Sequence, residues 1–95
     1  MEAIVEITNK KGLHARAAAK FVKTVANYNA VVNVCKKGAD GAEDSSPVVG
    51  SSILGLMMLG ADPGSKLHIT AEGEQAAEAL AALKELLENK FGEGE

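Results

Sequence analysis

The clearest chemical signal is His14, which lies where a glycine-containing loop leads into a helical pattern; residues 12–16 read Gly-Leu-His-Ala-Arg. The first backbone N–H groups of a helix have no partner inside the helix, and the macrodipole makes that end positive, so an anion there is stabilised. A phosphoryl group on the His14 ring would meet the N–H groups of Ala15, Arg16 and Ala17, and the Arg16 guanidinium would add charge-assisted hydrogen bonds. His14 and Arg16 are therefore the candidate catalytic residues, although the same spacing is typical of a capping or surface histidine.

Ser52 is the second candidate, because it precedes a short apolar pattern and can cap a helix over residues 52–59. That capping role would explain Ser52 by itself. Leu56 and Leu59 are three apart and can face the core. Leu54 and Met57 would then be turned away from the core, with Ile53 between the two sides. Such a helix is either fully buried or offers a patch for a partner protein.

Two lysines on the first helical pattern, Lys20 and Lys23, can form a basic rim beside this patch. A solvated helix face is an equally good interpretation of either lysine. The charge of the whole chain is uneven: residues 1–39 carry seven basic and two acidic side chains, whereas residues 40–95 carry three and eleven. The basic part could attract an acidic partner.

The elements that must position these residues follow from the apolar pattern. We expect strands at residues 2–8, 31–37, 48–50 and 65–71, and helices over 15–27, 52–59 and 76–91. The last helix has the most regular stripe: Ala76, Leu80, Leu83, Leu87 and Phe91. On the first helix we expect a stripe of smaller residues: Ala15, Ala18, Ala19, Val22, Val25 and Ala26.

This order, β-α-β-β-α-β-α, favours an α+β fold. Short connections leave little room for parallel crossovers, so we expect a four-stranded, mainly antiparallel sheet with three helices on one face, an open-faced β-sandwich. Ninety-five residues fit one domain, which we place at residues 1–91 with a flexible tail at 92–95.

Composition excludes several other functions. A net charge of −3 and 3% aromatic residues argue against nucleic-acid binding. There is no run of about 18 apolar residues and no signal-like start, so we expect a cytoplasmic protein with no membrane insertion. We also expect it to be a monomer. The single Cys35 excludes an internal disulfide, and the spacing of His14, His68 and Cys35 does not support a metal site. We expect no cofactor, and no use of ATP by the chain itself.

Three blocks of sequence, residues 12–22, 52–60 and 69–74, resemble the HPr family, the histidine-containing phosphocarriers of the bacterial phosphoenolpyruvate-dependent phosphotransferase system. The resemblance implies that enzyme I phosphorylates Nδ1 of His14 and that an enzyme IIA domain accepts the group. The chain would then be an intermediate in phosphoryl transfer rather than a stand-alone catalyst. It also implies that the helix after Ser52 lies beside His14 and docks partners.

In several HPr relatives the serine that corresponds to Ser52 is phosphorylated by an HPr serine kinase/phosphorylase, so Ser52 is a candidate regulatory site. The chain departs from many relatives at Ala17, where they have proline, and in its long acidic loop at residues 38–47. The resemblance leaves open whether the carrier serves sugar uptake or a nitrogen-related regulatory phosphorelay. The alternative to a carrier is a regulatory binding module.

Overall fold

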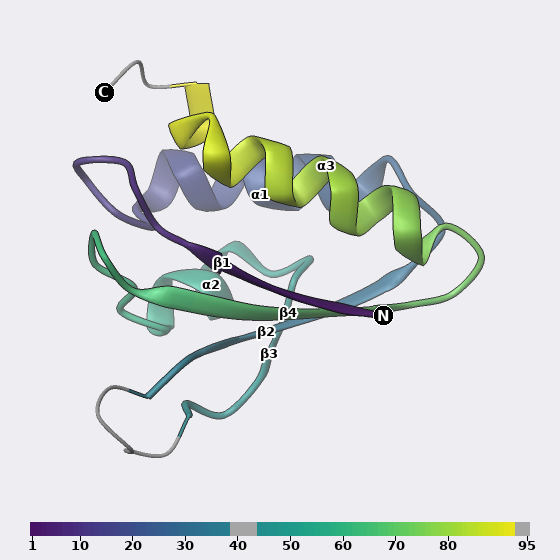
Figure 1. Ribbon diagram of the computed structural model, residues 1–95, viewed down its shortest axis with the longest axis horizontal. Coiled ribbons are helices and arrows are strands. Elements are labelled where there is room, and N and C mark those ends of the chain that lie inside the picture. The colour runs from purple at the N-terminus through teal and green to yellow at the C-terminus, as the bar shows by residue number, and fades with distance from the viewer. Residues whose placement is uncertain (39–43, 93–95) are drawn as a thin grey trace.

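The computed structural model describes residues 1–38 and 44–92 (Figure 1). Its elements follow the predicted order: β1 (Glu2–Glu6), α1 (Ala15–Ala26), β2 (Val31–Lys36), β3 (Val48–Val49), α2 (Ile53–Met58), β4 (Lys66–Glu72), α3 (Ala76–Glu88) and a short 3₁₀-helix, η1 (Lys90–Gly92). Half of the predicted acidic loop, residues 39–43, and residues 93–95 of the predicted tail lie outside the described residues.

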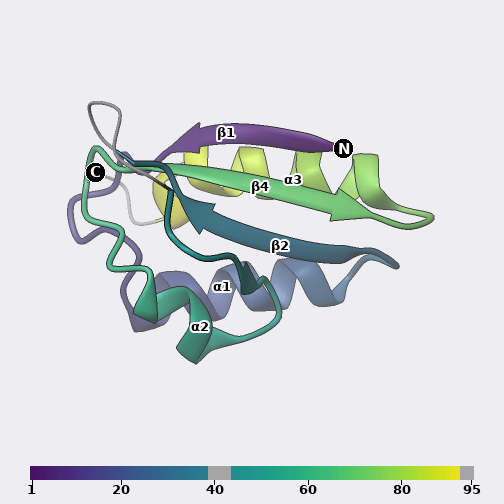
Figure 2. The same cartoon turned by 90° about the horizontal axis from the view of Figure 1, so that it is seen from below.

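The four strands form one sheet in the order β1-β4-β2-β3, and every neighbouring pair is antiparallel. Strand β4 shows why one face is covered: Leu67, Ile69 and Ala71 are fully buried, whereas the alternating His68 and Thr70 are only half-buried. All three α-helices lie on the buried face, and the other face is open (Figure 2). The predicted open-faced sandwich is confirmed.

Helix α3 buries the predicted stripe, with Ala76, Leu80, Leu83 and Leu87 in the core. The predicted length is wrong, because the helix ends at Glu88. Phe91 is buried as expected, but it lies in η1 with a left-handed backbone, φ 56°. The chain reverses there and returns the ring to the core, since burying an aromatic side chain contributes about 1.5–3 kcal/mol.

The face of α1 that packs on the sheet also differs from the prediction. The buried residues are Ala17, Ala18, Phe21 and Val25, and Val22 is half-buried. The predicted members Ala15, Ala19 and Ala26 are exposed instead. Phe21 explains the rotation, because the ring has far more apolar surface to bury than any alanine and turns its own side of the helix inward.

Candidate functional site

His14 is the N-cap of α1. Its backbone is extended, with φ −85° and ψ −178°, and its Nδ1 accepts a hydrogen bond from the backbone N–H of Arg16 at 3.3 Å. An accepting nitrogen has a lone pair and no proton, so a neutral ring in this geometry has its proton on Nε2. The side chain is half-buried and lies at the positive end of the helix. The predicted position of His14 is therefore correct.

The loop before His14 is held by a close backbone contact with Ala61 and by two hydrogen bonds. Gly12 has φ +68°, and a Cβ there would lie 2.7 Å from the Ala61 carbonyl oxygen, so glycine is required for both conformation and space. The Leu13 N–H donates to that same oxygen at 3.0 Å. The fully buried Asn9 donates from Nδ2 to the Gly12 carbonyl at 2.8 Å. These contacts set the direction in which the chain enters α1.

Of the residues after His14, some are exposed beside its ring and others are buried in the core. Ala15 and Arg16 are exposed on the first turn. The Ala17 side chain is fully buried, so it faces the core and only its N–H can serve the site. The Ala18 N–H donates to the His14 carbonyl at 2.8 Å and begins the helical ladder. Alanine at position 17 therefore serves packing.

Ser52 is the N-cap of α2, with its Oγ accepting from the Gly55 N–H at 3.0 Å, as the capping interpretation predicts. The side chain remains half-exposed. Helix α2 packs beside α1, so the two N-cap residues stand on neighbouring helices (Figure 2).

Helix α2 is buried on one side only. Leu56 and the C-cap Leu59 are in the core, whereas Leu54 is 69% exposed and Met58 is 76% exposed. Ile53 and Met57, at 42% and 43%, complete the exposed side. We call Ile53, Leu54, Met57 and Met58 the α2 apolar patch. Full burial, the alternative interpretation, is thereby excluded. Sequence reasoning missed Met58, although its position four residues after Leu54 places it on the same helix face.

The two lysines have different surroundings. Lys23 is exposed, as predicted. Lys20 is half-buried, and its ammonium donates to the backbone carbonyl of Phe91, so it ties α1 to η1. The solvated-face interpretation therefore does not describe Lys20, because the chain reversal after α3 brings a carbonyl group to its ammonium.

The fold and the site together define a class: small open-faced β-sandwich domains that present a histidine at the N-terminus of their first helix. A family model described as "PTS HPr component phosphorylation site" matches residues 1–89. The chain belongs to the HPr family of the phosphotransferase system.

Individual relatives match over almost their whole length. The phosphocarrier protein HPr of Pseudomonas aeruginosa is 50% identical over 91 residues, which cover 96% of this chain and 94% of that protein. The solved structure of HPr-C-His from Thermoanaerobacter tengcongensis has a TM-score of 0.83 at 41% identity, covering 98% of this chain and 97% of that one. HPr from Bacillus anthracis has a TM-score of 0.79 at 36% identity, covering 92% and 95%.

Within residues 1–38 and 44–92, no helix combines the length and the apolar character that crossing a membrane requires.

Proposed function

We propose that this protein is a phosphocarrier that holds a phosphoryl group on Nδ1 of His14 and passes it to another protein. The observation that supports this most directly is the hydrogen bond from the Arg16 N–H to Nδ1. It holds a nucleophilic lone pair at the helix end where an incoming phosphoryl group is stabilised. Membership of the HPr family and the similarity to proteins named phosphocarrier support the same function.

In the transfer step, the Nδ1 lone pair forms a bond to phosphorus while the bond between phosphorus and its donor breaks, and the donor keeps that electron pair. The ring proton stays on Nε2 as the new bond forms. Once Nδ1 is bonded to phosphorus, it no longer accepts from the Arg16 N–H. That N–H, with those of Ala15 and Ala17, can then donate to the phosphoryl oxygens. The Arg16 guanidinium adds the charge-assisted contact, and such positioning and charge stabilisation are the main requirements of phosphoryl transfer.

We propose enzyme I as the donor and an enzyme IIA domain as the acceptor. Both would dock on the α2 apolar patch next to His14. An apolar surface that contains two methionines can adapt to two different partners. Lys23, exposed on α1, is proposed as a basic group at the rim of this surface, where it would favour encounter with an acidic partner. We also propose that the protein acts in the cytoplasm as a monomer.

Ser52 is the proposed regulatory site, with an HPr serine kinase/phosphorylase as its modifying enzyme. A phosphate on Oγ would put about two negative charges beside the α2 apolar patch. It would therefore repel an acidic partner and crowd the docking surface. A purely regulatory binding module is not favoured, because it would not need a nucleophilic ring nitrogen at the helix end. Sugar uptake and a nitrogen-related phosphorelay both remain compatible with this site.

The test is labelling with phosphoenolpyruvate and enzyme I. We expect one acid-labile, alkali-stable phosphoryl group per chain, and we expect His14→Ala to abolish it. His68→Gln is the matched control, because the chain has only two histidines. Label that persists in His14→Ala, or that is lost in His68→Gln, would refute the assignment of His14.

A further inference from the structure

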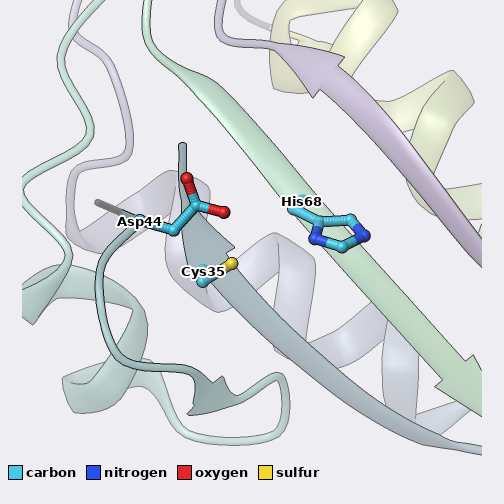
Figure 3. Close-up of side chains that lie close together, drawn as sticks. All are labelled: Cys35, Asp44 and His68. Carbon is cyan, nitrogen blue, oxygen red and sulfur yellow. The ribbon is translucent and has the colours of Figure 1, made fainter. Parts of the chain in front are cut away.

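The open face of the sheet carries a second cluster of reactive side chains, away from His14. Cys35 of β2 and His68 of β4 are direct partners in the antiparallel register, so both point outward from the same pleat. Asp44 lies above them, on the segment that leads toward β3 (Figure 3). The Cys35 sulfur, one carboxylate oxygen of Asp44 and one ring nitrogen of His68 all lie within 4.8 Å of one another.

We propose that Cys35, Asp44 and His68 form a binding site for a divalent d-block cation, with zinc(II) as the best match. Thiolate, imidazole and carboxylate are the three ligand types that zinc takes in proteins, and three protein ligands leave a fourth position for water. A thiolate and a carboxylate together also neutralise the charge of the ion. A sulfur ligand disfavours magnesium and calcium, which prefer oxygen.

The distances need only a small adjustment. Tetrahedral zinc bonds of about 2.0–2.3 Å place neighbouring ligand atoms about 3.3–3.6 Å apart. Because the three ligand atoms already lie within 4.8 Å of one another, each pair would have to approach by at most about 1.5 Å. When the ion binds, the S–H bond of Cys35 breaks, its proton leaves to solvent, and the sulfur–metal bond forms.

A separate contact supports His68 as a ligand. Its Nε2 is paired with the carboxylate of Glu2 on β1. An ionised carboxylate can only accept, so Nε2 carries the proton, and in the neutral ring Nδ1 has the lone pair. Figure 3 shows one ring nitrogen turned toward Cys35 and Asp44 and the other turned away, toward β1. A carboxylate on the far nitrogen is the usual way in which proteins orient a metal-binding histidine.

Asp44 is also held in position. Its Oδ1 accepts from the Gly38 N–H at 2.9 Å, and its Oδ2 lies 3.1 Å from the Lys37 ammonium. These two contacts fix the orientation of the Asp44 carboxylate. Each carboxylate oxygen retains a lone pair for a metal ion. Lys37 is the competing cation, because its ammonium would have to share Asp44 or move away.

The cluster is accessible. A hollow of about 480 Å³ on the open face is lined by Asn33, Val34, Cys35, Pro47, His68 and Thr70. Its size gives a hydrated ion a path to both strand residues. The spacing of Cys35 and His68 along the chain gives no sign of this site, because strand pairing alone brings them together. The proposal does not depend on phosphoryl transfer, since His14 lies at the end of a helix on the other side of the sheet.

The test uses Co²⁺ as a coloured substitute for zinc, added to the reduced, chelator-treated full chain. We expect one Co²⁺ per chain, a near-ultraviolet thiolate-to-cobalt charge-transfer band, and loss of that band when one equivalent of Zn²⁺ is added. Cys35→Ser should remove the band. His68→Gln and Asp44→Asn should each weaken Co²⁺ binding about tenfold or more. Glu2→Gln should weaken it about tenfold through the orientation of His68.

Two further variants make the test specific. His14→Gln, the control for the other histidine, should bind Co²⁺ like the unmodified protein, and Lys37→Met should bind it more tightly. Circular dichroism of each variant checks that it is folded. The proposal is overturned by a lack of saturable binding, by a band that keeps its affinity in both His68→Gln and Asp44→Asn, or by binding that disappears in His14→Gln.

Discussion

The Leu13 N–H donates to the carbonyl oxygen of Ala61 across 3.0 Å. This bond fastens the loop that carries His14 to the segment that follows α2. The bond therefore connects the His14 loop to the end of the helix that carries the α2 apolar patch, so the proposed docking on α2 would present the His14 ring to a partner in a set orientation.

Gly12→Ala should destabilise the protein by about 2 kcal/mol or more and should slow phosphorylation of His14. The added Cβ would lie 2.7 Å from the Ala61 oxygen, and the left-handed backbone adds about 1 kcal/mol of its own. Gly60→Ala is the matched control: its φ is +62°, but apart from its neighbours in the chain no residue has an atom within 4 Å of the added Cβ. Urea unfolding of both variants separates the steric clash with the Ala61 oxygen from the backbone strain that both positions share. If the two variants lose equal stability, the clash at Gly12 has no role.

Arg16→Ala should slow transfer to His14 about tenfold or more while changing the free energy of unfolding by less than about 0.5 kcal/mol. The guanidinium is exposed and alanine is a good helix former, so the loss is of charge-assisted contacts to phosphate. Lys23→Ala removes a positive charge further along the same helix. The two variants are compared by their rates of phosphorylation with excess enzyme I. If both slow the rate equally, Arg16 acts only through net charge.

Ser52→Asp should keep the stability of α2 and yet reduce phosphorylation by enzyme I. Aspartate is a good N-cap and can accept from the Gly55 N–H, but it adds a negative charge beside the α2 apolar patch. Ser52→Ala should show the opposite pattern, with about 1 kcal/mol of stability lost and transfer retained. Ser51→Asp, on the exposed neighbouring residue, is the charge control. Transfer that is unchanged in Ser52→Asp would count against a regulatory site here.

Leu54→Ser and Met58→Ser should raise the KM for enzyme I severalfold with little change in stability. Both side chains are more than two-thirds exposed, so they contribute little to the folded core. Leu56→Ala, in the same helix but fully buried, should instead cost about 2–5 kcal/mol. If neither serine variant changes KM or kcat, the α2 apolar patch is not the docking surface.

Lys20→Met should lower the free energy of unfolding by about 1 kcal/mol, because the Phe91 carbonyl loses its donor. Lys23→Met, which leaves the same methylene chain on an exposed site, should change it by less than about 0.5 kcal/mol. Thermal or urea unfolding compares the pair. Equal stabilities would show that the tie between α1 and η1 contributes nothing.

The sequence by itself determined the features that depend on neighbours in the chain. The α3 stripe, the Ser52 cap and the glycine turn before His14 were all predicted, because helix periodicity and capping involve residues within about four positions of each other. His14 was placed at a helix start for the same reason. Its Nδ1 hydrogen bond to Arg16 spans only two residues.

Only the tertiary structure decided contacts between residues that are distant in the chain. Phe21 outweighed the alanines in setting the buried side of α1, and the reversal at Phe91 gave Lys20 its partner. Cys35 and His68 are 33 positions apart and become neighbours through the register of β2 with β4. Register is set by which faces of all the strands bury together, a condition that involves the whole core and cannot be read from any one segment.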